Sequence, residues 1–188
     1  MVVWLADDAA SRRPFKSARG AETRPTSSLV RGALFAIIEP YLERPLVLDL
    51  FAGTGALGIE ALNHGAAGVD FVESNLRQCV ALRARLRALG HETMGHVHWT
   101  RVERALGFLK GPYDLVLMDP PYAYAGTATL LDRIASSSLV ADGGILAVEH
   151  GRRTLMPDAV GDMTVLKRRR HGDTSLTIYI YGGSNETW

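Results

Sequence analysis

Apolar positions along the chain repeat alternately at the spacing of strands and at the spacing of helices. Short apolar runs predict seven strands, at 46–50, 68–73, 96–101, 114–118, 145–148, 164–170 and 174–181. Apolar residues at helical spacing predict helices at 28–42, 56–64, 76–89, 103–109 and 127–136. Strands that alternate with helices are typical of βαβ units, so the pattern predicts a parallel sheet covered on both faces.

The end of the chain departs from this alternation. Only His171-Gly172-Asp173 separates the last two predicted strands, which indicates an antiparallel hairpin. We therefore predict an α/β fold: a doubly wound, mostly parallel, seven-stranded Rossmann-like sheet with an antiparallel C-terminal edge hairpin. We expect a small N-terminal extension at 1–26, the main domain at 27–183 and a tail at 184–188.

Composition narrows the class of protein. The chain has 188 residues, 47% of them hydrophobic and 22% charged, which is typical of a globular domain rather than a disordered one. No apolar stretch is long enough for a transmembrane helix, so we expect no membrane association. Cys79 is the single cysteine and has no partner for an internal disulfide, which favours a cytoplasmic location.

The net charge of +1 conceals an uneven distribution of basic residues. They gather near both ends of the chain, at Arg12, Arg13, Lys16, Arg19, Arg24 and Arg31 and at Lys167, Arg168, Arg169 and Arg170. Arginine side chains suit phosphate groups, so these clusters favour contact with a nucleic acid. A merely solvated surface is the alternative interpretation.

A glycine-rich segment follows the first predicted strand. Residues 49–58 read D-L-F-A-G-T-G-A-L-G, which contains G-x-G-x-x-G between a strand and a helix. Glu73 ends the second strand, where a carboxylate can accept hydrogen bonds from ribose hydroxyls. Both features suit NAD as well as other adenosine cofactors. Asp49 would oppose a pyrophosphate but could hold a cationic amino group, which favours S-adenosylmethionine.

A second motif, Asp119-Pro120-Pro121-Tyr122, follows the fourth strand. Consecutive prolines predict a rigid loop at the carboxyl rim of the sheet, where open α/β sheets bind their ligands. Asp119 and the proline carbonyls are hydrogen-bond acceptors, and Tyr122 offers an aromatic face. Convergent acceptors beside a stacking surface suit the exocyclic amine of a planar base, although a capped turn is the simpler interpretation.

Residues 119–122 resemble the catalytic motif of class I amino-methyltransferases. Further segments resemble the bacterial 16S rRNA guanine-N2 methyltransferases of the RsmD family: 23–27 (T-R-P-T-S), 30–35 (V-R-G-A-L-F), 49–58, 71–73 (F-V-E) and 172–174 (G-D-T). The similarity extends from about Arg13 to Tyr181. It implies a methyltransferase domain that moves a methyl group from S-adenosylmethionine to the N2 amine of a guanine in small-subunit ribosomal RNA, within the assembled particle.

The resemblance and the motifs together assign roles to residues. We expect catalysis from Asp119, Pro120, Pro121 and Tyr122, with Asp119 and the Pro120 carbonyl accepting from the amine. We expect cofactor contacts from Asp49, Phe51, Ala52, Gly53, Thr54, Gly55, Glu73, Ser74, Asn75, Glu103 and Arg104. The ten terminal basic residues and the extension would contact RNA. We expect a monomer that needs no metal.

The chain departs from the family pattern at three places. Arg12-Arg13 replaces the usual Gly-Arg of an early hairpin, and Asn75 replaces an acid two residues after Glu73. Arg104 stands where an acidic residue often faces adenine, so Glu103 or a backbone group would take that role. A DNA adenine or other amino-methyltransferase, an NAD-dependent oxidoreductase and a non-catalytic RNA-binding module remain alternatives. A zinc site at His91, His96 and His98 is disfavoured because a further ligand is lacking.

Overall fold

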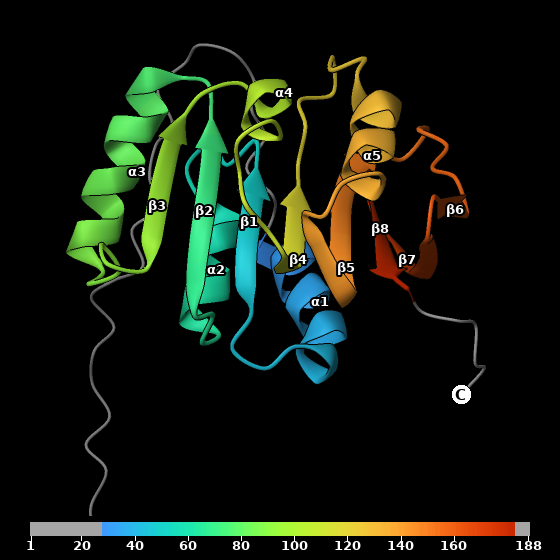
Figure 1. Ribbon diagram of the computed structural model, residues 1–188, viewed down its shortest axis with the longest axis horizontal. Helices are drawn as coiled ribbons and strands as arrows, with labels where there is room; N and C mark the ends of the chain where they lie inside the picture. The colour runs from blue at the N-terminus through green and yellow to red at the C-terminus, as the bar shows by residue number, and fades with distance from the viewer. Residues whose placement is uncertain (1–27, 183–188) are drawn as a thin grey trace, which may run out of the picture.

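A computed structural model describes residues 28–182 as one mixed sheet flanked by helices (Figure 1). The sheet order is β3-β2-β1-β4-β5-β8-β7-β6. The strands are β1 (Leu46–Leu50), β2 (Gly68–Glu73), β3 (Gly95–Trp99), β4 (Tyr113–Met118), β5 (Val140–Gly151), β6 (Ala159–Val160), β7 (Met163–His171) and β8 (Thr174–Tyr181). The predicted fold class is confirmed.

The number of strands differs from the prediction. The described sheet has eight strands rather than seven, because Ala159 and Val160 pair with Thr164 and Met163 as a short antiparallel edge strand. Two residues are too short to produce a recognisable alternation of apolar and polar positions, so the sequence gives no sign of this strand.

Strands β1 to β5 are parallel, and β8 runs antiparallel between β5 and β7. The predicted hairpin of β7 and β8 is therefore confirmed, and its second strand is interior rather than at the edge. Gly151 at the end of β5 pairs with Thr174 at the start of β8. This register places the turn between β7 and β8 at the same rim as the carboxyl ends of the parallel strands.

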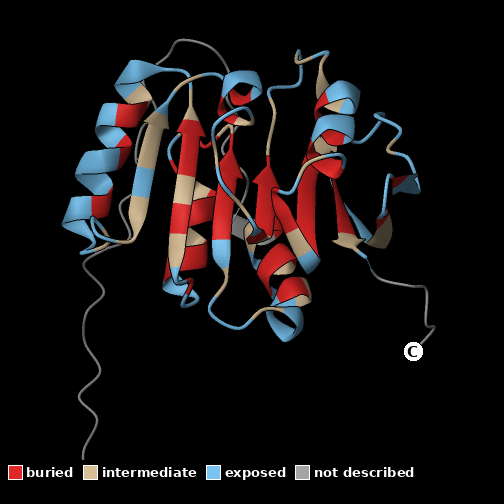
Figure 2. Ribbon diagram, in the orientation of Figure 1, coloured by how far each residue is buried: buried red, intermediate tan, exposed pale blue. Residues whose placement is uncertain are grey.

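The helices cover both faces of the sheet. They are α1 (Ser28–Ile38), the 3-10 turn η1 (Glu39–Tyr41), α2 (Ala56–Asn63), α3 (Leu76–Ala88), α4 (Val102–Ala105) and α5 (Thr127–Ala135). Helices α1, α2 and α3 pack into one buried cluster, and α4 and α5 pack into the other. Figure 2 shows the resulting buried central strands and helices that are exposed on their outer sides. Helix α4 is shorter than predicted, because the chain turns at residues 106–108.

The parallel strands are nearly continuous apolar runs because both of their faces are covered. Four of the five residues of β1 are buried, and only Leu46 is exposed. Within residues 28–182 no helix is long and apolar enough to cross a membrane. The extension at 1–26, the tail at 184–188 and the predicted RNA contacts Arg12, Arg13, Lys16, Arg19 and Arg24 lie outside the described residues.

Candidate functional site

The glycine-rich segment is anchored from below by Asp49. This residue is buried, and its Oδ2 accepts a hydrogen bond of 2.9 Å from the backbone N–H of Gly58 in α2. A Cβ at Gly58 would lie 2.3 Å from the Phe71 ring and 2.9 Å from that oxygen, so only glycine fits. Burial raises the pKa of Asp49 to about 7, the hydrogen bond from Gly58 opposes the rise, and Asp119 and Glu73 add to it. The Asp49 carboxyl group thus lies beneath the glycine-rich segment and is hydrogen-bonded to the helix that follows it.

The backbone of the same segment turns sharply above Asp49. Phe51, Gly53 and Gly55 all have positive φ, of 63°, 55° and 74°. Positive φ is uncommon for an aromatic residue and costs free energy, and such strain gathers at functional sites. The turn is closed by a hydrogen bond of 2.7 Å from Gly55 N–H to the Ala52 carbonyl. Thr54 lies within this turn and is exposed.

Glu73 is positioned by main-chain donors on both sides. Gly53 N–H donates to its Oε2 at 2.8 Å, and Asn75 N–H donates to its Oε1 at 2.6 Å. Glu73 therefore joins the glycine turn to the start of α3 and remains partly exposed at the rim. Its oxygens keep lone pairs that can accept further hydrogen bonds, such as those of ribose hydroxyls.

Asn75, which we expect to contact the cofactor, also has a structural role as the N-cap of α3. Its side-chain oxygen caps α3 by accepting from Arg77 N–H at 2.9 Å and from Gln78 N–H at 3.3 Å. The neighbouring Ser74 is exposed, and its carbonyl accepts from the indole N–H of Trp99 at 3.0 Å. Because only the side-chain oxygen of Asn75 is used for the cap, its amide N–H groups can donate to a ligand at the rim.

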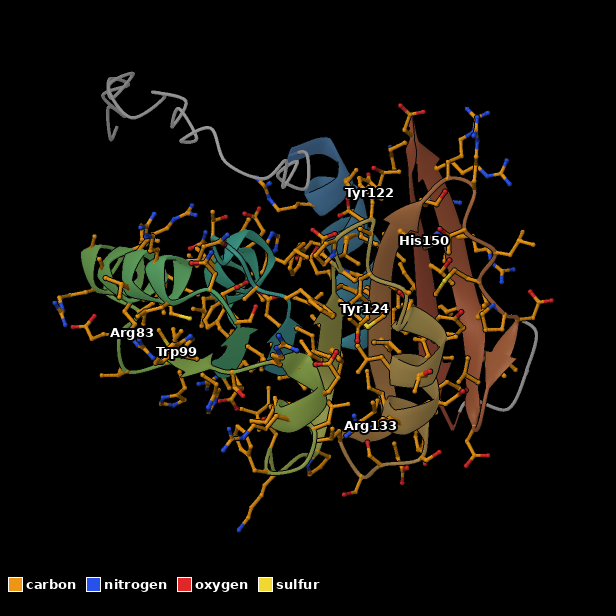
Figure 3. All side chains as sticks on the ribbon, turned by 90° about the horizontal axis from the view of Figure 1, so that it is seen from above. Arg83, Trp99, Tyr122, Tyr124, Arg133 and His150 are labelled. Carbon is orange, nitrogen blue, oxygen red and sulfur yellow. The ribbon has the colours of Figure 1, made fainter. Side chains whose placement is uncertain are left out.

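The Asp119-Pro120-Pro121-Tyr122 loop lies beside the glycine segment. Asp119 follows β4, and its N–H points to the Leu50 carbonyl at 3.5 Å. Tyr122 is 63% exposed, yet its hydroxyl shares a hydrogen bond of 3.0 Å with Thr174 Oγ1. Its ring lies against Gly151, where an added Cβ would be 3.4 Å away. The exposed ring is therefore fixed by the ends of β5 and β8 (Figure 3).

Tyr124 is a further site residue, which the sequence interpretation missed. Its hydroxyl donates to Glu103 Oε1 at 2.6 Å, and its ring meets Phe51 edge-on with centroids 4.9 Å apart. Its N–H donates to the Pro121 carbonyl at 2.8 Å. Tyr124 thus joins three predicted segments, and it lies centrally when the rim is viewed from above (Figure 3). The second aromatic of the sequence D-P-P-Y-A-Y was the available signal.

Electrostatics at this contact follow from the hydrogen bond. The hydroxyl of Tyr124 lowers the pKa of Glu103, while burial and the carboxylate raise the pKa of Tyr124 to about 12. Arg133 of α5 donates to the Glu103 carbonyl at 3.0 Å, and Glu103, Tyr124 and Arg133 line a shallow pocket. Arg104 is exposed on α4. Glu103 itself is exposed, so its carboxylate can accept a further hydrogen bond.

The predicted RNA contacts within the described residues differ from one another. Lys167, Arg169 and Arg170 are exposed along β7, and Arg31 lies in α1. Arg168 instead binds Asp158 Oδ1 at 2.6 Å and the carbonyls of Met156 and Pro157 at 2.9 and 3.0 Å. Most of the Arg168 donors are thus engaged within the protein.

The histidines of the disfavoured zinc site make other contacts. His98 Nε2 lies 2.7 Å from Asp70 Oδ1, and His91 Nε2 lies 3.3 Å from Asn63 Oδ1. In the part of the chain that the structure describes, no three histidine, cysteine, aspartate or glutamate side chains are grouped as metal ligands would be.

Comparison with known proteins adds to this geometry. The family profile described as Conserved hypothetical protein 95 matches residues 8–180. The chain belongs to this family. YlbH of Bacillus subtilis, named as a candidate rRNA methyltransferase, is 32% identical over 170 residues, which are 89% of this chain and 92% of YlbH.

Two further comparisons with this family member, one of sequence and one of structure, are with proteins of Escherichia coli. Ribosomal RNA small subunit methyltransferase D of strain K12 is 28% identical over 159 residues, 83% of this chain and 78% of its own. The solved structure of YhhF, described as a candidate methyltransferase, superposes with a TM-score of 0.76 at 25% identity and covers 86% of this chain and 89% of its own. The two comparisons thus cover most of this chain and most of each relative.

Proposed function

We propose that this family member is an S-adenosylmethionine-dependent methyltransferase that modifies the exocyclic N2 amine of a guanine in 16S ribosomal RNA. The observation that carries the proposal is the convergence of the glycine segment, Glu73 and the Asp119 loop at one rim. The names of the relatives support RNA as the substrate. The RNA would be methylated within the small ribosomal subunit. The enzyme would act as a monomer without a metal.

The residues present fit the proposed cofactor. Burial raises the pKa of the Asp49 carboxyl, and a nearby ammonium would favour its ionised form. Glu73 presents acceptors for ribose, and Glu103 presents one for the exocyclic amine of adenine. Phe51, Ala52, Gly53, Thr54 and Gly55 would line the cofactor, with Ser74, Asn75 and Arg104 at its edges. S-adenosylmethionine supplies an electrophilic methyl group on a sulfonium.

The substrate half of the site would act by orientation. The guanine must leave its stack, and the exposed Tyr122 ring offers a face on which it can lie. Asp119 and the Pro120 carbonyl would accept hydrogen bonds from the two N–H groups of the amine. These two bonds would aim the nitrogen lone pair at the incoming methyl group. Pro121 keeps this loop rigid. Holding the reacting atoms in line is then the main catalytic effect, and Asp119 takes the departing proton.

A transfer assay with labelled S-adenosylmethionine tests the proposal. Small subunits from cells that lack the enzyme, protein-free ribosomal RNA and DNA serve as the three acceptors, and the labelled base is mapped. Label on N2 of a single guanine in 16S ribosomal RNA is the expected result. Label on DNA or on another base, or no transfer to any acceptor, would overturn the proposal. Calorimetry with NAD in parallel tests the oxidoreductase alternative.

A further inference from the structure

The loop between β5 and β6, residues 152–158, is fixed at both of its ends. At the first end, Arg152 N–H donates to the Asp173 carbonyl at 2.8 Å, and Thr154 N–H donates to the Gly151 carbonyl at 2.9 Å. At the second end, Arg168 holds the carbonyls of Met156 and Pro157. The Tyr179 hydroxyl also donates to the Pro157 carbonyl at 2.9 Å. Residues of β7, of β8 and of the turn between them thus hold both ends of the loop.

Between these two anchors the loop turns an apolar side chain to solvent. Leu155 is 97% exposed, more than any other large hydrophobic residue in the described part of the chain. Arg152 and Arg153, which precede it in the loop, are exposed, and the one acid of the loop, Asp158, binds Arg168. A single exposed leucine is unremarkable on a surface. An exposed leucine between two anchors and beside two arginines needs an explanation.

The loop begins at the glycine that supports Tyr122. The position of a Cβ on Gly151 is 3.4 Å from the Tyr122 ring and 3.6 Å from Thr154 Oγ1. The ring and the first turn of the loop therefore pack on the same residue. Tyr122 and His150, the residue before Gly151, lie on the same side of the rim in Figure 3.

We propose that Leu155 enters the RNA base stack beside the target guanine while Arg152 and Arg153 contact the flanking phosphates. This inference rests on the proposed function, because it takes the nucleotide on Tyr122 to be extruded from RNA. Extrusion leaves a gap in the stack, and nucleic-acid-binding proteins commonly insert apolar side chains between bases. The cationic side chains of Arg152 and Arg153 suit the phosphates on either side of that gap.

Kinetics on small subunits from cells lacking the enzyme test this inference. Leu155→Asp should lower kcat/KM by about tenfold, the scale of losing one stacked contact, while Leu155→Met should retain activity. Arg153→Ala should raise KM and reduce the salt dependence of kcat/KM. Val80→Asp and Arg87→Ala, at exposed positions of α3, are the matched controls and should behave as the wild type. Unchanged cofactor affinity and melting temperature show that each variant is folded.

Crosslinking identifies what the loop contacts. Photoreactive benzoylphenylalanine at position 155 should crosslink to 16S ribosomal RNA near the methylated guanine. A crosslink to a ribosomal protein, or wild-type kinetics for Leu155→Asp and Arg153→Ala, would overturn the inference and leave the proposed function standing. Failure of the wild-type enzyme to methylate the subunits would overturn the proposed function and this inference with it.

Discussion

The two halves of the rim are built in different ways. On the side of β1, β2 and β3, the carboxyl groups of Asp49 and Glu73 are held by backbone N–H groups of Gly58, Gly53 and Asn75. On the side of β5, β8 and β7, the exposed side chains of Tyr122 and Leu155 belong to loops that hydrogen bonds tie to these strands. The first half suits a small ligand of fixed shape, and the second suits a large partner that approaches from solvent.

The largest expected effect tests the substrate half. Asp119→Ala should lower kcat by about 10²- to 10⁴-fold, the usual scale of a positioned acid or base, because the amine loses its acceptor. Cofactor affinity should stay unchanged, because Glu73 and the glycine segment are intact. Steady-state kinetics and calorimetry measure the two quantities. Near-normal turnover would remove Asp119 from the mechanism.

The next effect tests the packing of the cofactor half, by which we mean the side of the rim at β1, β2 and β3. Gly58→Ala places a methyl group 2.3 Å from Phe71 and 2.9 Å from Asp49 Oδ2. Overpacking of this kind should lower the free energy of unfolding by about 1–3 kcal/mol, as measured by denaturant titration. Gly32→Ala is the control, since open space surrounds that position in α1 and the free energy of unfolding should not fall. Equal stability of both variants would contradict the packing described here.

A smaller effect tests whether S-adenosylmethionine and RNA bind to different halves of the rim. Glu73→Ala should weaken S-adenosylmethionine binding about tenfold or more, since a hydrogen bond to a charged group contributes about 1.5–3 kcal/mol. Affinity for RNA should not change, because Glu73 lies in the cofactor half. Calorimetry and filter binding measure the two affinities. If cofactor affinity is unchanged, the ribose is held elsewhere.

The smallest effect tests the hydrogen bond between Tyr122 and Thr174, the first residue of β8. Thr174→Val removes the hydroxyl that meets Tyr122 and should lower kcat/KM by about two- to tenfold, the value of one ordinary hydrogen bond. Thr174→Ser should restore activity. In a Tyr122→Phe background, Thr174→Val should have no further effect, because the bond is already absent. Additive losses in the double variant would show that Thr174 acts by another route.

Sequence reasoning located the rim because strand ends can be read from apolar runs. Glu73 ends such a run, Asp119 follows one, and Asp49 is the residue before the last of β1. The parallel arrangement brings these strand ends to one edge. The contact of Tyr124 with Glu103 and the bonds of Arg168 to Asp158 and to two carbonyls could not be predicted. They depend on how helices and loops distant in sequence pack, and a side chain's charge does not reveal whether it faces solvent or a carbonyl. The structure thus adds one residue to the rim, Tyr124, and it adds the hydrogen-bond partners of the residues that the sequence had already placed there.

The interior position of β8 has a consequence for the order in which the protein matures. β8 is the last strand of the described sheet in chain order, yet it lies between β5 and β7 and supplies Thr174 to Tyr122. During synthesis the helices and strands of the cofactor half emerge first and can pack together. The hydrogen bond that fixes Tyr122, the proposed platform for the base, forms only when β8 has left the ribosome and inserted beside β5. A nascent chain would therefore acquire its cofactor pocket before it acquires the means to hold RNA.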